Sequence, residues 1–350
     1  MKIDSLNKLA WRKFKKNKLA FFSLLYLLFC LFISVFAVPF LPDNTPMANN
    51  MNIELATLPP LSKITFLKIP KSKNPESSYI SSFFLGKELN CDKIAISSYQ
   101  KLDKGIIYSP YASKIEKVFY GKYYIDKQIF FLGTDKYGRD LLSRLVYATR
   151  ISFAIGFISV FISLILGLIL GLTAGYYRGI VDDIIMWFVN VMWSIPTLML
   201  VIAITLALGK GFWQVFVAVG LTMWVEVARI VRGQVLLIRE LEFVQAANIL
   251  GLKESRVIFK HILPNISGPI IVISAINFAA AILIEAGLSF LGVGAQPPMP
   301  SWGSMIKDHY AFIVMQKEYL AILPGLAIMF SVLSFTLLGN GLRDAFDVKE

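Results

Sequence analysis

Long apolar runs alternate with polar segments along this chain, and six of the runs are long enough to cross a membrane as helices. They cover residues 19–41, 151–175, 183–208, 213–230, 270–291 and 319–338. The first run carries no charge, and as a helix it would be about 35 Å long, enough to cross roughly 30 Å of hydrocarbon. Pro196 predicts a kink inside the third run. The pattern therefore predicts an all-α polytopic membrane protein with six transmembrane helices.

Polar segments before, between and after these runs define the other expected regions. Residues 1–18 carry seven lysines and arginines among apolar residues, which is typical of a cytosolic amphipathic helix at a membrane surface. Residues 19–41 form the expected first transmembrane helix, and residues 42–148 an extracytoplasmic insertion that ends in a polar turn. Residues 149–342 form a core of five helices, and residues 343–350 a cytosolic tail.

The insertion is rich in proline and lysine and contains no run apolar enough to span a membrane. Residues 115–132 place Gly121 and Lys122 between two runs rich in Val, Phe, Tyr and Ile, which predicts a β-hairpin. We therefore expect a small extracytoplasmic domain of mixed or β character. Its lysines are compatible with an outer location, because long loops translocate largely regardless of charge.

Composition and charge support the assignment to a membrane. Hydrophobic residues make up 56% of the chain, whereas a typical soluble domain has about 45–50%. The formal net charge is +12, and lysine and arginine collect on the cytosolic flanks of membrane helices. A cytosolic N-terminus places residues 176–182, residues 231–268 and the C-terminus in the cytosol, where basic residues gather. The expected partner of the basic residues is therefore the lipid bilayer and not nucleic acid.

The most informative polar segment is residues 239–264, between the fourth and fifth apolar runs. Apolar residues at helical spacing predict a helix over residues 242–250 that is broken by Gly251. A second helix is expected over residues 254–262 and ends at Pro264. An amphipathic loop lying on the lipid surface would show the same pattern.

Small side chains in this segment would let the backbone of a partner protein approach closely. Gln245, Ala246 and Ala247, followed by Gly251 and then Ile262-Leu263-Pro264, resemble the EAA loop of binding-protein-dependent ABC importer permeases. In that family the loop is a coupling helix that docks into a groove on an ATPase subunit. The resemblance implies ATPase contacts at Glu242, Gln245, Ala246, Ala247, Gly251 and Pro264. Gln245 stands where the family has Glu, Glu242 lies one turn earlier, and His261 stands where many members have Ile.

Three further segments resemble permeases of the DppC/OppC type, which serve dipeptide, oligopeptide and nickel importers. They are residues 131–152 (beginning Phe-Leu-Gly-Thr-Asp-Lys-Tyr-Gly-Arg-Asp), residues 288–303 (beginning Leu-Ser-Phe-Leu-Gly-Val-Gly) and residues 342–347 (Leu-Arg-Asp-Ala-Phe-Asp). The resemblance covers most of residues 131–347 and the first span, and it leaves residues 42–130 uncovered. It implies a type I ABC importer permease core of the MetI-like kind in the bacterial cytoplasmic (inner) membrane.

The resemblance also implies a function, which is that of a permease subunit of an ATP-driven importer of di- or oligopeptides. The chain would form half of the translocation pathway. Its expected partners are a second, DppB/OppB-like permease, two ABC ATPase subunits that bind ATP and magnesium, and an extracytoplasmic solute-binding protein. An importer of nickel or another small solute is the alternative in this class. A self-sufficient secondary transporter would predict internal repeats and a relay of intramembrane charges, which this sequence does not display.

A polar turn precedes the second apolar run and is expected at the outer membrane surface. Its residues suit a tight turn and are Gly133, Thr134, Asp135, Gly138, Arg139 and Asp140. Asp135 or Asp140 could pair with Arg139 or Arg144, and we favour a structural cap on the span over a contact with substrate. Pro297, Pro298 and Pro300 predict a second rigid turn, with Trp302 as an interfacial aromatic anchor.

Few ionisable residues lie inside the apolar runs. Glu226 and Glu285 are candidates for the translocation pathway, because an acid inside a membrane is expensive to bury and is a functional candidate by default. Glu285 could bind a substrate amino group, or it could be a structural acid that packs against the partner permease. The resemblance places an acid there across varied substrates, which favours the structural role. Asn277 is a weaker pathway candidate; with Asn190 and Asn340 it is more typical of interhelical hydrogen bonds.

Several enzyme signatures are missing from the sequence. It contains no G-x-x-x-x-G-K-[ST] loop, no H-E-x-x-H, no cysteine pair at metal-ligand spacing and no G-x-S-x-G. His261 and His309 are the only histidines, so a histidine-based or zinc enzyme has little support. We therefore expect a transport subunit with no catalytic residue, no metal site and no cofactor of its own.

Overall fold

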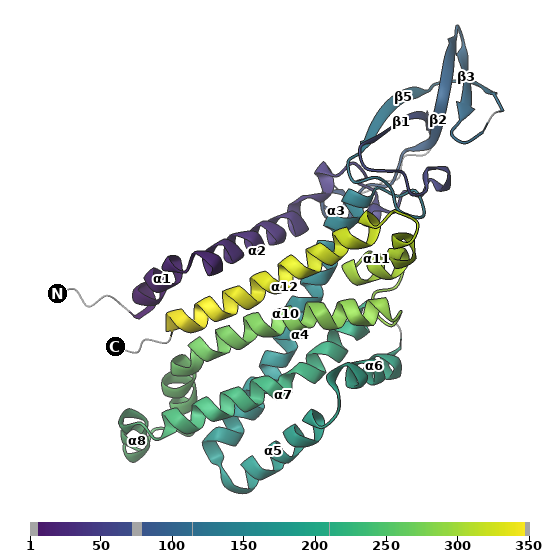
Figure 1. Cartoon of the computed structure of the whole chain (residues 1–350). Coiled ribbons are helices and arrows are strands. Elements are labelled where there is room, and N and C mark those ends of the chain that lie inside the picture. Colours follow the sequence, from purple (N-terminus) through teal and green to yellow (C-terminus); the bar gives the residue numbers. More distant parts are fainter. Residues whose placement is uncertain (1–5, 72–78, 114, 210, 347–350) are drawn as a thin grey trace. The chain divides into compact units, whose positions relative to one another are not determined.

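The computed structural model describes residues 6–71, 79–113, 115–209 and 211–346 (Figure 1). Its longer helices are α1 (Leu6–Lys16), α2 (Lys18–Phe36), α4 (Leu141–Tyr177), α5 (Gly179–Trp193), α6 (Thr197–Leu208), α7 (Phe212–Arg239), α10 (Ser267–Phe290) and α12 (Tyr319–Phe346). The short helices are α3 (Tyr79–Leu85), α8 (Glu242–Ile249), α9 (Glu254–Val257) and α11 (Trp302–His309). The strands are β1 (Ser62–Pro70), β2 (Cys91–Leu102), β3 (Gly105–Pro110), β4 (Lys117–Tyr120) and β5 (Tyr124–Phe130).

The described residues fall into two compact units. The first, which we call the helical unit, comprises Ser152–Gln296 with the described parts of Met1–Phe29 and Ala327–Glu350. The second, which we call the mixed unit, comprises Cys30–Ile151 and Pro297–Leu326 as far as they are described, and it contains the β-sheet. Each unit is described by itself below.

The helical membrane fold expected from the sequence is confirmed. Five helices among the described residues are long and apolar enough to cross a membrane, or up to six if α5 and α6 form one broken span. The kink predicted at Pro196 within residues 183–208 is confirmed in its place and is sharp, because α5 and α6 meet there at a bend of 93°. Pro196 lacks an N–H group and disfavours helical backbone in the residue before it, so the helix ends there and a new one begins.

Helix α4 packs closely against α7 in the helical unit. Gly167, Gly171 and Gly175 recur every fourth residue along one face of α4. A Cβ atom added to Gly171 would lie 2.6 Å from the carbonyl oxygen of Ala228, and one added to Gly167 would lie 2.5 Å from Val227. The glycines therefore let the two helix backbones approach one another, as small residues do in membrane bundles.

The β-sheet of the mixed unit confirms the expected β character of the insertion but not the expected hairpin. The strand order is β4-β3-β2-β1-β5, with every neighbouring pair antiparallel. β4 pairs with β3 and β5 pairs with β1, so the two strands predicted to form a hairpin lie at opposite edges of the sheet. β4 and β5 therefore each pair with an earlier strand and not with one another, and the local sequence pattern does not reveal this pairing.

A short link between the two edge strands shows that the sheet is curled. Only residues 121–123 separate β4 from β5, and four Cα steps reach about 14 Å. The edges of a flat sheet of this size would be about 19 Å apart. Leu67, Ile96, Ile106, Phe119 and Ile125, one from each strand, accordingly share one apolar cluster.

Candidate functional site

The segment 239–264 of the helical unit folds as two helices around a glycine turn. α8 ends at Ile249 with Leu250 as its C-cap residue, and Gly251 follows with φ +71°. The N–H of Gly251 donates to the carbonyl of Asn248 at 3.0 Å, and the N–H of Leu252 donates to the carbonyl of Ala247 at 3.2 Å. These two bonds form a Schellman motif, in which a left-handed glycine closes the end of a helix. The predicted break at Gly251 is confirmed.

Pro264 does not end the second helix, contrary to the prediction. It lies in a 3-10 turn over Leu263–Ile266 that leads directly into α10. Immediately before it, Ile258–Ile262 form a π-helical turn. The wider π turn displaces the backbone that the proline ring would otherwise meet one turn earlier, so the helical path continues past Pro264.

α8 has one face buried in its own chain and another that is exposed. Val244 and Ala247 are buried in an apolar cluster that includes residues of α4, α7 and α10. On the other side Ile249 is 86% exposed and Leu250 is 78% exposed. Ala247 therefore faces inward and, of the two alanines expected to admit a partner, Ala246 alone is exposed. Figure 1 shows α8 as a short helix beyond the C-terminal end of α7.

Three residues at the end of α4 hold the segment in place, and sequence reasoning missed them. The guanidinium of Arg178 pairs with Glu240 at 2.5 Å. The hydroxyl of Tyr177 donates to Glu254 at 2.8 Å, and the carbonyl of Tyr176 accepts a hydrogen bond from Arg239. In the sequence, the only indication of these contacts is that two tyrosines and an arginine follow one another at the end of an apolar run.

Gln245 and Glu242, two of the residues expected to contact the ATPase, differ in their contacts within this segment. The side-chain nitrogen of Gln245 donates to the carbonyl of Glu240 at 3.1 Å. A glutamate at this position has no donor when ionised and would not make this bond. Glu242 is exposed in the first turn of α8, so it supplies the acidic group on this surface.

Glu285 and Asn277 lie on buried parts of α10. Glu285 is fully buried, and the hydroxyl of Ser289 donates to its Oε1 atom at 2.6 Å, with Ser152 at 3.5 Å from Oε2. The amide of Asn277 has no hydrogen-bond partner among the described residues, so the predicted interhelical bond is not present for this residue. For Asn190 it is confirmed, because Asn190 accepts a hydrogen bond from Arg229 at 3.1 Å.

Glu285→Gln is expected to leave substrate uptake within about twofold of wild type, because Gln retains an acceptor for Ser289 and the site stays hydrogen-bonded. Uptake by the reconstituted transporter, normalised to the amount of assembled complex, measures this. A large loss of uptake with normal assembly would instead give Glu285 a role in binding substrate.

Glu226 occupies a different environment from Glu285. It is an exposed residue of α7 and lines a cavity of about 170 Å³ at the bend between α5 and α6. It also lines an adjoining cavity of about 230 Å³ together with Arg229. A third cavity of about 530 Å³ is lined by Gln234, Asn340 and Arg343 among others. The pathway candidates thus separate, with Glu226 facing open space and Glu285 and Asn277 enclosed.

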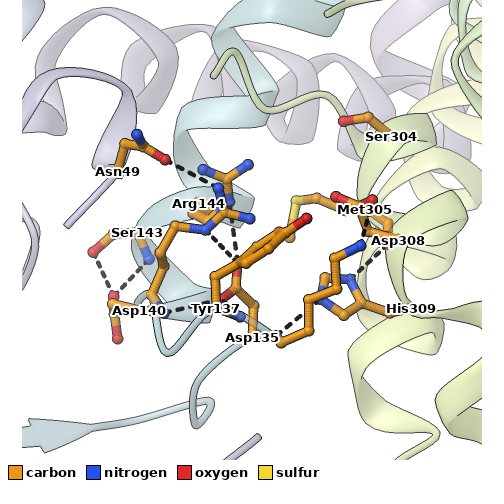
Figure 2. Close-up of polar contacts among 12 residues, drawn as sticks. Asn49, Asp135, Tyr137, Asp140, Ser143, Arg144, Ser304, Met305, Asp308 and His309 are labelled. Atoms are coloured by element: carbon orange, nitrogen blue, oxygen red, sulfur yellow. Dashed lines mark hydrogen bonds and ion pairs between the residues drawn. The ribbon is translucent and has the colours of Figure 1, made fainter. Parts of the chain in front are cut away.

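In the mixed unit, the polar turn is organised around Asp135 (Figure 2). Its Oδ2 atom lies 2.6 Å from Nε of Arg139 and 3.6 Å from Nε of Arg144, and all three side chains are buried. Its Oδ1 atom accepts the backbone N–H groups of Tyr137 and Arg139 at 2.8 and 2.9 Å. The predicted pairing is therefore confirmed for Asp135.

Asp140 has a different task, which is to cap α4. Its Oδ2 atom accepts the backbone N–H and the hydroxyl of Ser143, and it precedes the first residue of the helix. Side-chain acceptors at this position satisfy the free N–H groups of a helix start. Burial raises the pKa of the Asp140 carboxyl above its usual range, against the effect of the bonds from Ser143.

Two glycines and a threonine fix the turn against residues 52–58. Gly138 has φ +70°, and a Cβ atom there would lie 1.7 Å from the carbonyl oxygen of Asn52. Gly133 has φ +80°, and a Cβ atom there would lie 2.2 Å from the carbonyl oxygen of Leu58. The hydroxyl of Thr134 accepts the N–H of Leu58 at 2.8 Å and donates to the carbonyl of Leu55 at 2.5 Å. Only glycine fits the two close contacts.

α11 completes this cluster through residues that the sequence did not single out for it. Nδ1 of His309 lies 2.7 Å from the carbonyl of Met305, and the backbone N–H of Lys136 points to Nε2 at 3.4 Å. Burial lowers the pKa of His309 below its usual value, so the ring is neutral at neutral pH. The ammonium of Lys136 pairs with Asp308 at 2.9 Å.

Trp302 is not the interfacial anchor that its position after three prolines suggested. It is buried, and its indole nitrogen donates to the carbonyl of Leu145 at 3.2 Å.

Within the described ranges, no group of three or more His, Cys, Asp or Glu side chains could hold a metal ion. The polar turn therefore contributes ion pairs, helix capping and packing.

Comparisons with known proteins identify families that match this chain. The family described as "Binding-protein-dependent transport system inner membrane component" matches residues 167–349, and "N-terminal TM domain of oligopeptide transport permease C" matches residues 5–60. A dipeptide transport system permease protein, DppC, of Alkalihalophilus pseudofirmus is 40% identical over 217 residues, which are 62% of this chain and 71% of the relative. A glutathione transport system permease protein, GsiD, of Pectobacterium atrosepticum is 42% identical over 218 residues, covering 62% and 72%.

Among solved structures, an inward-facing form of the MetNI methionine ABC transporter aligns with 60% of this chain and 97% of its own, at 20% identity and a TM-score of 0.47. The match to the family extends over more than half of the residues, from the second apolar helix to the C-terminal end. The chain therefore belongs to the family of binding-protein-dependent transport system inner membrane components, and within it to the DppC/OppC type of ABC importer permease.

Proposed function

We propose that this chain is a permease subunit of an ATP-driven importer of short peptides, and that it forms half of the translocation pathway. The named substrates of its relatives, dipeptides and glutathione, support this class of cargo. The partners would be a second, DppB/OppB-like permease, two ABC ATPase subunits and an extracytoplasmic solute-binding protein. The chain would lie in the bacterial inner membrane with both termini in the cytosol.

The observation that carries the proposal is the divided surface of α8. Ile249 and Leu250 are exposed, while Val244 on the opposite side is fully buried. Leu241 and Phe243 are exposed in the same segment, and contiguous exposed apolar side chains mark an interaction site. An ATPase subunit that covers Ile249 and Leu250 would be the partner of this surface. It would also supply the energy of ATP hydrolysis, since the sequence of this chain contains no nucleotide-binding loop of the G-x-x-x-x-G-K-[ST] type.

The buried side of α8 gives a physical route for that energy. Val244 packs in one cluster with Leu172 of α4, Val231 of α7 and Ile273 of α10. Close-packed interiors transmit displacement because they have few voids to absorb it. A movement of α8 imposed by the ATPase would therefore displace the membrane helices that line the pathway.

Gly251→Pro tests the coupling role. Proline requires φ near about −65° and has no N–H, whereas Gly251 has φ +71° and donates to Asn248. We expect co-purification with the ATPase subunits and ATP-driven uptake to fall at least about tenfold, since the turn and the α8 surface are lost together.

Gly251→Asn is the matched control at the same position. Asparagine tolerates left-handed backbone better than other side chains, and no atom lies within 4 Å of the added Cβ. It should retain assembly and uptake. Normal assembly and ATP-driven uptake by the proline variant would contradict the proposal.

A further inference from the structure

The cavity at the bend between α5 and α6 contains an acidic group that has no ion-pair partner among the described residues. It lies among helices of the helical unit, and Trp193, Thr197, Thr222 and Glu226 are among the residues that line it. Apolar side chains such as Met223 and Ile284 form the rest of the wall. Glu226 thus stands at the edge of a largely apolar pocket in a membrane-spanning helix.

Arg229, a basic residue that shares the adjoining cavity with Glu226, interacts with other groups. The guanidinium of Arg229 stacks on the ring of Trp193, 3.5 Å from its centroid, and donates to Asn190 at 3.1 Å. Over the described part of the chain, Glu226 has no ion-pair or hydrogen-bond partner. A carboxylate in an apolar span is costly unless a cation or water meets it, so the pocket is suited to a ligand that brings a cation.

The other polar groups of the pocket indicate which kind of cation it would bind. The hydroxyl of Thr222 donates to the carbonyl of Val219 at 2.8 Å, which leaves its oxygen as an acceptor. A ligand ammonium could therefore donate both to Glu226 and to a hydroxyl oxygen, while the apolar wall receives a short side chain next to it. A ligand carboxylate in the same place would meet the negative charge of Glu226.

We propose that Glu226 binds the amino-terminal ammonium group of the transported peptide, and that the pocket at the α5–α6 bend receives its first side chain. This inference rests on the proposed function in peptide import and adds a recognition residue to it. It predicts that the permease itself recognises a free amino terminus.

Carbodiimide labelling tests this recognition without the solute-binding protein. The full complex with its ATPases, in lipid nanodiscs, would be labelled in the presence of excess tri-alanine or excess N-acetyl-tri-alanine and analysed by mass spectrometry. Tri-alanine should lower the labelling of Glu226 by about threefold or more and the acetylated peptide should not, because acetylation removes the charge that pairs with the carboxylate.

Asp183, an exposed carboxylate of the neighbouring helix α5, is the matched control and should be labelled equally in all samples. Equal protection of Glu226 by both peptides, or by neither, would overturn the proposal. A Glu226 that resists labelling without peptide would also overturn it, because the carboxylate would then be covered by another subunit.

Uptake by the Glu226→Gln variant gives an independent measurement. The substitution keeps the size of the side chain and removes its charge, and we expect ATP-driven uptake of tri-alanine to fall about tenfold. Co-purification with the other subunits should be unchanged; its loss would show an ion pair between subunits and overturn the proposal, as would normal uptake. Absence of ATP-driven peptide uptake by the wild-type complex would instead contradict the proposed function itself.

Discussion

Asp135→Asn is expected to destabilise the polar turn of the mixed unit by about 3–5 kcal/mol, because removing one partner of a buried ion pair leaves the other charge uncompensated. Asp135 is fully buried and faces both Arg139 and Arg144, which are themselves buried. Hydrogen exchange of residues 133–140 measures the effect. The N–H groups of Tyr137 and Arg139, which Asp135 accepts, should exchange at least about 100-fold faster than in wild type.

Asp126→Asn is the matched control for this prediction. Asp126 pairs with Lys68 at 2.5 Å, but its side chain is 45% exposed. The hydrogen bond from Lys68 lowers the pKa of Asp126, yet exposed pairs contribute at most about 1 kcal/mol. Exchange in the sheet should therefore change little. Equal effects of the two substitutions would show that burial of Asp135 does not control the stability of the turn.

The double substitution Ile249→Ser with Leu250→Ser is expected to weaken binding of the ATPase subunits about 100-fold or more. Burying a side chain of this size contributes about 1.5–3 kcal/mol, and both are exposed in the isolated chain. The fold should be unaffected, because neither residue belongs to the cluster that holds α8. The dissociation constant of the detergent-solubilised permease complex for its ATPase measures the effect.

Ile115→Ser controls for the loss of an exposed apolar side chain, since Ile115 is 70% exposed in the mixed unit. It should leave ATPase binding unchanged. If the double substitution also left binding unchanged while releasing the segment from lipid vesicles, the surface of α8 would be a membrane contact, which is the alternative that its amphipathic pattern allows.

Features that depend on length and local pattern could be predicted from the sequence. The apolar runs are long enough to predict membrane-spanning helices, and helices are present at each of them, although residues 183–208 form two helices. Gly251 was recognisable because a glycine between two helical patterns is a common helix end. The curled sheet was not recognisable, because one of its strand pairs, β1 with β5, joins residues far apart in the chain, such as Phe66 and Asp126.

Contacts of polar residues that are close in sequence could also be predicted, whereas contacts between distant residues could not. Asp135 and Arg139 are four residues apart, so their pairing was within reach of sequence reasoning. His309 meets Lys136 only through the tertiary fold, and Tyr177 meets Glu254 in the same manner. Glu285 and Glu226 look alike as acids in apolar runs, and their different burial became visible only when the packing of α10 and α7 was known.

Site-specific photo-crosslinking from residue 249 tests the central claim most directly. A benzophenone amino acid in place of Ile249 would be illuminated in membranes that contain the whole transporter, with the same residue in place of Ile115 as a control. The proposed coupling role predicts a crosslink from residue 249 to the ATPase subunit and none from residue 115. Crosslinks from residue 249 to lipid alone, in vesicles that carry out ATP-driven peptide uptake, would contradict it.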